Sequence, residues 1–143
     1  MTCYLDPSVV LPIFVKEPAS AAVDGFMSRV AEELLVSDFA AAEVASALSR
    51  LVRMGRLQPS EGAACLTDFD TWRAAMTTVA EIHAADIRLA GGYVRRFDLA
   101  LRAPDALHVA IARRLEVALV TLDRRMANAA RQLGVVVEAL SSS

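Results

Sequence analysis

The sequence is poor in the residues that build disulfide frameworks and cysteine-based zinc sites. Among its 143 residues there are two cysteines, Cys3 and Cys65, and two histidines, His83 and His108. Two cysteines far apart in the chain exclude a disulfide framework and a zinc site made of thiolates, and they fit a reducing cytoplasm. Any metal site in this protein must therefore be built mainly from carboxylates.

The sequence also lacks a long apolar run and the glycine motifs of nucleotide-binding folds. No apolar stretch approaches the roughly 18 residues that span a bilayer. The chain begins without a basic segment ahead of an apolar one, so we expect a soluble protein with no export signal and no membrane partner. The segment after the first apolar strand, Asp6-Pro7-Ser8-Val9, contains no glycine, which excludes a dinucleotide-binding dehydrogenase. A phosphate-binding P-loop is absent too.

A broad basic surface is missing as well. The 15 basic and 17 acidic residues give a net charge of −2, and Lys16 is the only lysine. A nucleic acid would therefore have to be bound by a local cluster of arginines.

What the sequence does contain is an alternation of short apolar segments and helical patterns. Its length indicates one domain, which we place at 1–140, with a flexible tail at 141–143. We expect strands at 3–5, 34–36, 76–79, 118–122 and 135–137. We expect helices at 7–15, 20–33, 38–53, 59–75, 82–97, 104–116 and 124–133, with Pro12 kinking or shortening the first and with Gly55 and Gly134 ending two others. This alternation predicts an α/β fold with a mostly parallel sheet and helices on both faces.

Four acidic residues are predicted to meet at one edge of this sheet. Asp6 and Asp123 end strands, Asp105 opens the helix that leads into the strand at 118–122, and Glu43 lies about one turn into the helix that follows 34–36. Such helices begin at the carboxyl edge of a parallel sheet, where open α/β sheets place their ligands. Taken singly, Asp6 and Asp123 are better explained as helix N-caps and Asp105 as a first-turn acid, whereas Glu43 is explained equally well as a solvated side chain.

Taken together, the four carboxylates favour a metal site. Two carboxylates about 4 Å apart repel by ~4 kcal/mol at an effective dielectric constant of about 20. Several of them cannot all stay ionised without a proton or a cation among them. Mg²⁺ prefers oxygen ligands, keeps several waters and is usually held directly by only one or two carboxylates. The remaining acids can orient its waters, which is chemistry suited to phosphate esters.

The same residues lie in four motifs that resemble a known family. The motifs are Tyr-Leu-Asp6-Pro-Ser8-Val-Val, Ala-Glu43-Val-Ala-Ser-Ala-Leu, Leu-Arg-Ala-Pro-Asp105-Ala-Leu-His-Val-Ala and Leu-Val-Thr121-Leu-Asp123-Arg-Arg-Met. In this order, between Tyr4 and Gly134, they resemble the PIN-domain ribonucleases, and among these the VapC-type toxins of bacterial toxin–antitoxin pairs. The resemblance implies a three-layer α/β/α sandwich around a mostly parallel sheet of about five strands. It also implies an acidic pocket for Mg²⁺ or Mn²⁺ and metal-dependent endoribonuclease activity.

The resemblance assigns positions and partners. The family's acidic positions and pocket hydroxyls correspond here to Asp6, Glu43, Asp105, Asp123, Ser8 and Thr121. Two prolines depart from the pattern: Pro7 stands where threonine or serine is more usual, and Pro12 stands where lysine is frequent. Each departure removes a possible RNA contact, and neither touches an acid. The resemblance further implies RNA as the substrate, a cognate antitoxin as a partner, and a homodimer formed partly through the helical hairpin around 55–59.

On this interpretation Asp6 and Asp105 hold the metal, while Glu43 and Asp123 complete its surroundings and help to deprotonate the attacking water. Water attack leaves a 5′-phosphate and a 3′-hydroxyl. The competing interpretation is a PIN fold that acts mainly as a binding or scaffold protein in a repressor complex, with little turnover.

Three further side chains near the acids are open to two interpretations each. Arg124 and Arg125 begin a helix at the acidic edge and are either phosphate contacts or part of a solvated surface. His108 follows Asp105 by three residues and is either a general base or a structural histidine.

Overall fold

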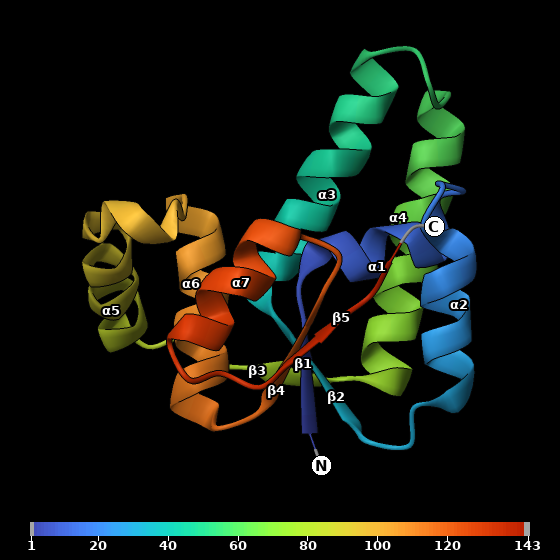
Figure 1. Cartoon of the computed structure of the whole chain (residues 1–143). Helices are drawn as coiled ribbons and strands as arrows, with labels where there is room; N and C mark the ends of the chain where they lie inside the picture. Colours follow the sequence, from blue (N-terminus) through green and yellow to red (C-terminus); the bar gives the residue numbers. More distant parts are fainter. Residues whose placement is uncertain (1, 142–143) are drawn as a thin grey trace.

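The computed structural model describes residues 2–141, and within them five strands form one parallel sheet in the order β3-β2-β1-β4-β5. The strands are β1 (Thr2–Leu5), β2 (Glu33–Ser37), β3 (Thr78–Ala80), β4 (Ala118–Thr121) and β5 (Val137–Ala139). The helices are α1 (Pro7–Phe14), α2 (Ser20–Arg29), α3 (Asp38–Arg53), α4 (Pro59–Met76), α5 (Ala84–Arg95), α6 (Ala103–Leu115) and α7 (Arg124–Gln132), with a 3₁₀ turn at Phe97–Leu99. Figure 1 shows the sheet between two groups of helices. The predicted α/β/α fold with a parallel sheet is confirmed.

The two faces of the sheet carry separate apolar clusters because successive strand residues point to opposite sides. Tyr4 and Leu119 face a cluster built with α5, α6 and α7. Leu5 and Val120 face a second cluster built with α1, α2, α3 and α4. β1 is the central strand of the sheet and β4 is its neighbour. Both strands are covered on both faces, and this packing fixes their ends relative to the helices that follow them.

Several element boundaries differ from the sequence prediction. The predicted helix at 20–33 ends at Arg29, because the chain needs a connection of three residues to reverse direction and enter β2 at Glu33. The predicted strand at 76–79 is 78–80, since Met76 is still helical and Thr77 caps α4 with its hydroxyl donated to the carbonyl of Arg73. The predicted helix at 82–97 is α5, 84–95, followed by the 3₁₀ turn.

The end of the chain and the first helix also depart from expectation. The last strand is 137–139 rather than 135–137, because the buried Val135 closes the end of α7 through a bond from its amide to the Ala130 carbonyl. Pro12 does not end the first helix, which continues to Phe14. Gly55 and Gly134 end α3 and α7 with φ of +73° and +82°, as predicted. The expected tail at 141–143 extends into residues 142 and 143, which lie outside the described residues.

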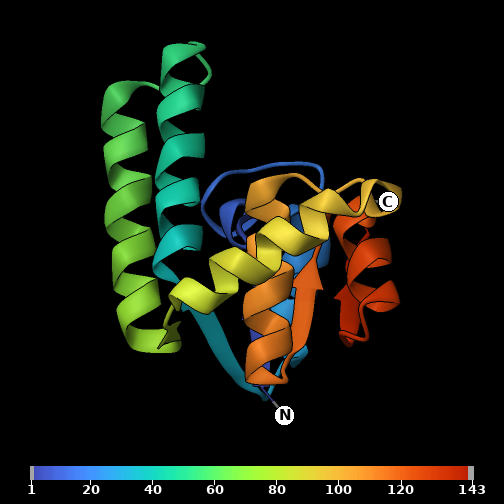
Figure 2. The same ribbon diagram turned by 90° about the vertical axis from the view of Figure 1, so that its left-hand side faces the viewer.

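Helices α3 and α4 form a hairpin that extends beyond the carboxyl edge of the sheet, as both views show (Figures 1 and 2). Its two helices approach closely at Gly62, where a Cβ atom would lie 2.8 Å from a methyl group of Val52. Because α3 begins directly after β2, its first turn lies at the carboxyl edge of the sheet, where β1 is the neighbour of β2. No helix within residues 2–141 has both the length and the apolar content needed to cross a membrane.

Candidate functional site

Asp6 lies directly after β1 and is 2% exposed. It is the N-cap residue of α1 by position, but its carboxylate makes no capping hydrogen bond to the helix. Both of its oxygens are instead held by hydroxyl groups: Ser8 Oγ donates to Oδ1 at 2.6 Å, and Thr121 Oγ1 donates to Oδ2 at 2.9 Å. The N-cap explanation for this side chain is therefore wrong.

Backbone amides fix the direction of these two hydroxyl bonds. Ser8 Oγ accepts from the amide of Leu122 at 3.0 Å, and Thr121 Oγ1 accepts from the amide of Asp123 at 3.0 Å. Each hydroxyl thus has its proton available for Asp6. The turn after β4 thereby orients the carboxylate at the end of β1. These hydrogen bonds link the carboxyl ends of the two neighbouring strands.

Burial raises the pKa of Asp6 to about 6. The hydrogen bonds from Ser8 and Thr121 and the nearby His108 favour the ionised form, whereas the charge of Asp123 opposes it, and the desolvation outweighs the favourable contacts. A carboxylate held out of water, next to another acid, is a group whose charge a bound cation would stabilise.

Glu43 is held by a chain of buried polar groups. His108 Nε2 lies 2.5 Å from Glu43 Oε1, and His108 Nδ1 lies 2.6 Å from the hydroxyl of Tyr4. The Tyr4 hydroxyl lies 2.8 Å from Ser37 Oγ, which accepts from the amide of Ala40 at the start of α3. His108 and Tyr4 are 1% and 0% exposed, so water does not compete for these bonds.

One arrangement of protons satisfies every member of this chain. Ser37 donates to Tyr4, Tyr4 donates to Nδ1 of His108, and Nε2–H donates to Glu43. No hydroxyl proton along the chain then lacks an acceptor. With this assignment His108 supports Glu43 and is not a free general base. The histidine is therefore structural, and it also positions one of the four acids.

Asp123 and Asp105 complete the acidic group. Asp123 is the N-cap of α7, and its Oδ1 accepts from the amide of Met126 at 3.0 Å, which leaves Oδ2 outside the cap. Asp105 lies in the first turn of α6 and is half-buried. Burial and the charge of Asp123 raise the pKa of Asp105, and Glu43 adds to this effect, whereas His108 and Arg102 oppose it.

The structure thus brings all four predicted acids to the carboxyl edge of the sheet. Asp123 interacts electrostatically with Asp6 and with Asp105, and Asp105 also interacts with Glu43. Within residues 2–141, no three histidine, cysteine, aspartate or glutamate side chains are close enough to enclose a metal ion directly. Mg²⁺ keeps several waters and takes only one or two carboxylates directly, so it does not need such an enclosure. The donor set, which is all oxygen, fits hard divalent cations.

Arginines lie near this edge on α7 and in a cavity beside α3. Arg124 and Arg125 are exposed at the start of α7, as predicted. A cavity of about 580 Å³ contains Glu43 in its lining together with Arg50, Arg53, Arg56 and Arg102. The first three come from the end of α3 and the turn after it. A helical-wheel count from Glu43 would have found Arg50, which is seven residues along the same face. Arg102 stands three residues before Asp105 and is a candidate phosphate contact from sequence alone, but only the fold places it in one cavity with Arg56 and the arginines of α3.

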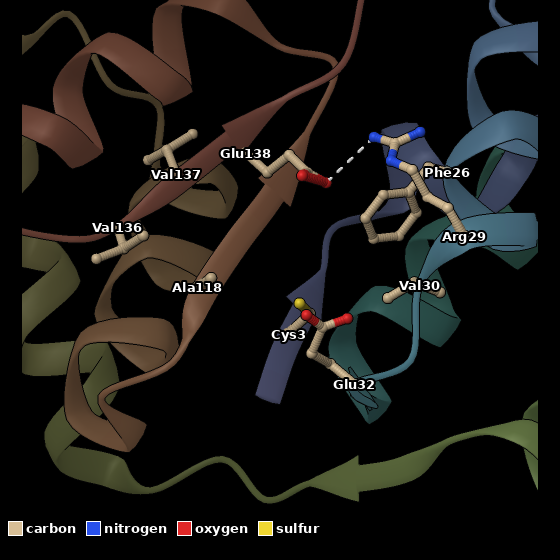
Figure 3. Close-up of a pocket in the computed structure, with 9 residues that line it drawn as sticks. All are labelled: Cys3, Phe26, Arg29, Val30, Glu32, Ala118, Val136, Val137 and Glu138. Atoms are coloured by element: carbon tan, nitrogen blue, oxygen red, sulfur yellow. Dashed lines mark ion pairs between the residues drawn. The ribbon is translucent and has the colours of Figure 1, made fainter. Parts of the chain in front are cut away.

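A second hollow lies at the opposite, amino-terminal edge of the sheet (Figure 3). Its volume is about 360 Å³, and Cys3, Phe26 and Ala118 are among its lining residues. Arg29 and Glu138 also line it, and they form an ion pair at 3.6 Å. It contains none of the four predicted acids, so the chemistry that they suggest belongs to the carboxyl edge.

Comparison with known proteins gives the class to which this fold and site belong. Residues 3–132 match the PIN domain family, so the chain is a member of the PIN domain family. It is 34% identical over 141 residues to Ribonuclease VapC46 of Mycobacterium tuberculosis (strain ATCC 25618 / H37Rv), and the match covers 96% of this chain and 97% of that protein. The resemblance to PIN-domain proteins is confirmed.

Solved structures share the fold at low sequence identity. VapC20 of Mycobacterium tuberculosis, described as a toxin that cleaves the sarcin-ricin loop, has a TM-score of 0.71 at 15% identity, covering 89% of this chain and 94% of VapC20. VapBC2 of Rickettsia felis, bound to a DNA fragment from its promoter, has a TM-score of 0.69 at 12% identity, covering 99% of this chain and all of the matched chain (100%). These likenesses establish the PIN-like α/β/α architecture.

Proposed function

We propose that this protein is a metal-dependent endoribonuclease and the toxin of a type II toxin–antitoxin pair. The observation that carries the proposal is the buried Asp6 carboxylate, which caps no helix and is grouped with three further acids. Membership of the PIN domain family and the relationship to a VapC ribonuclease support the activity. A protein that only bound a partner would have no use for this concentration of negative charge.

Asp6 and Asp105 are proposed to hold Mg²⁺ or Mn²⁺, directly or through water. When bound, the ion lowers the pKa of a coordinated water and offsets negative charge on the phosphoryl oxygens. Ser8 and Thr121 orient Asp6 for this task, because their hydroxyl protons point at its two oxygens. Asp123 or Glu43, the latter held by His108, takes one proton from the attacking water, and the 3′-oxygen released when its bond to phosphorus breaks takes a proton from solvent. Arg124 and Arg125 are proposed to contact substrate phosphates.

The activity is tested with purified protein and a structured RNA, with Mg²⁺, Mn²⁺ or EDTA. We expect cleavage that requires the metal, is lost in Asp6→Asn and Asp105→Asn, and leaves 5′-phosphate and 3′-hydroxyl ends. Calorimetry should show Mn²⁺ binding to the wild type and not to Asp6→Asn. Cleavage that persists in EDTA, or a 2′,3′-cyclic phosphate product, contradicts the proposal.

The proposed role as the toxin of a toxin–antitoxin pair also suggests protein partners and a cellular location. We propose that the chain forms a homodimer in the cytoplasm and binds a cognate antitoxin. The toxin–antitoxin complex among the structural relatives supports the antitoxin partner. The free cysteines Cys3 and Cys65 fit a reducing compartment. Light scattering on the protein alone and with its co-expressed neighbour tests the assembly.

A further inference from the structure

A groove leads away from the acidic edge along one face of α3. Glu43 lies at one end, and Arg50 and Arg53 follow on the same helix, about 10 and 15 Å further along its axis at ~1.5 Å per residue. Arg56, from the turn after α3, and Arg102, the residue before α6, line the same cavity of about 580 Å³. The arginine groove is defined by these four arginines.

The arginine groove carries more positive than negative charge. Arg29, Arg73, Arg96 and Arg114 each form an ion pair with an aspartate or glutamate elsewhere in the fold. Within residues 2–141, none of the four groove arginines has such a partner, and Arg53 bonds only to the hydroxyl of Ser49. Glu17 and Glu43 also line the cavity, so the four arginines leave an excess of two positive charges.

Arginine is suited to phosphate because its planar guanidinium donates two parallel hydrogen bonds to phosphate oxygens. The whole chain has a net charge of −2, so long-range attraction does not draw nucleic acid to the protein in general. A local row of unpaired arginines next to the carboxylates supplies the attraction where it is needed. The carboxylates repel a phosphodiester, and the row can hold the strand on one side of them.

We infer that the arginine groove binds the phosphate backbone of the RNA strand on one side of the cleavage point, so that the strand leaves the acidic edge along α3 toward the hairpin tip. This inference rests on the proposed ribonuclease function. It adds the direction in which the RNA strand runs. It also adds a contact that does not depend on RNA sequence, because phosphate contacts position a nucleic acid without reading its bases.

The test measures RNA binding in EDTA, where cleavage does not interfere. The probe is a fluorescent single-stranded RNA of 20 nucleotides, titrated at several KCl concentrations. The variants are Arg50→Gln, Arg53→Gln, Arg56→Gln and their combination. Each substitution should lower the slope of log Kd against log salt by about 0.7, and the triple variant should bind about tenfold more weakly whatever the RNA sequence.

The control is Arg131→Gln, which removes an exposed arginine from the last turn of α7 as Arg50→Gln and Arg53→Gln do from the last turn of α3. It should leave the affinity and the slope unchanged. If the triple variant does not fold, the single variants decide the question. Unchanged RNA affinity in folded groove variants overturns the inference, and so does weaker binding of a poly-glutamate peptide with RNA affinity preserved, which would mark the groove as a site for an acidic protein segment.

Different results contradict the proposed ribonuclease function and the role of the arginine groove. A wild type that binds RNA in EDTA but cleaves none with Mg²⁺ or Mn²⁺ contradicts the proposed function, while the variants still decide the arginine groove. A wild type that cleaves RNA, with groove variants that bind like it, contradicts the groove alone. In the cleavage assay itself, the groove variants should raise KM and leave kcat within about twofold.

Discussion

His108 Nε2 lies 2.5 Å from Glu43 Oε1, although the two residues are 65 positions apart in the sequence. The bond joins α6 to α3 at the carboxyl edge of the sheet, and its histidine is 1% exposed. Through Tyr4 and Ser37 the same chain of bonds reaches β1 and the end of β2. One acid of the proposed site is therefore positioned by groups from four elements.

Substitution of His108 should reduce activity by misplacing Glu43. His108→Leu removes the donor to Glu43, and we expect kcat to fall by about 10- to 100-fold and Mn²⁺ affinity to weaken. His108→Gln can keep an N–H donor near the carboxylate and should recover part of both. Tyr4→Phe breaks the chain one bond further away and should have a smaller effect. Calorimetry with Mn²⁺ and steady-state cleavage rates test this, and a folded His108→Leu variant with normal metal binding contradicts it.

Asp6→Asn should abolish activity and yet stabilise the metal-free fold at high pH. The pKa of Asp6 is raised from its ordinary 3.8 to about 6 in the folded protein. The free energy of unfolding therefore rises as pH falls through 6, and this added stability is absent at pH values above 6. At pH 8 the asparagine variant should exceed the wild type in unfolding free energy by up to about 3 kcal/mol.

Urea denaturation in EDTA at pH 8 and pH 4 measures this difference, which should vanish at the lower pH. The exposed Asp24→Asn on α2 serves as the control. A difference between Asp6→Asn and the wild type that is the same at both pH values would show that the buried charge does not govern stability.

Ser8→Ala should shift the pH dependence of cleavage. The hydrogen bond from Ser8 favours the ionised form of Asp6, so its loss raises the pKa of Asp6 further. The acidic limb of the rate profile should move to higher pH, with activity reduced several-fold near pH 6 and nearly normal at pH 8.5. Thr121→Val should act in the same direction. The exposed Ser28→Ala is the control, and an unshifted limb in Ser8→Ala refutes the assigned role.

Breaking the Asp86–Arg114 ion pair should destabilise the joint between α5 and α6. Asp86 is 1% exposed, and it accepts from Arg114 Nε at 2.7 Å and from the amide of His83 at 2.8 Å. Burial would raise the pKa of Asp86, but the bonds from Arg114 and His83 outweigh it and lower the pKa. The pair thus contributes stability above the ordinary pKa of an aspartate and loses it as pH falls through the lowered value.

Arg114→Met leaves a buried carboxylate without its partner and should cost about 3 kcal/mol at pH 7, with a smaller cost at acidic pH where Asp86 is protonated. Arg96→Met removes an exposed pair with Asp98 and should leave the melting temperature unchanged. Thermal denaturation of both variants at two pH values compares the buried and the exposed pair. Equal falls in melting temperature in the two variants would contradict the stabilising role of the buried Asp86–Arg114 pair.

Patterns within short stretches of sequence determined much of this protein. The alternation of apolar strands with helices predicted the parallel sheet, because each strand with a crossover helix is a local unit with its own periodicity. The acids at the ends of those units could be assigned to one edge, since parallel strands end on the same side. The glycines that end α3 and α7 were recognised because only a residue without Cβ takes positive φ easily.

Only the tertiary structure decided what each side chain at that edge does. Sequence favoured a helix cap for Asp6, but Ser8 and Thr121 hold its carboxylate, and Thr121 lies 115 residues away. Contacts between distant segments also let His108 support Glu43. They likewise bring Arg102 beside α3, into one cavity with Arg56. Local periodicity fixes the direction in which a side chain leaves its own helix or strand. The partner that it meets is fixed by how the elements pack, and no short stretch of sequence carries that information.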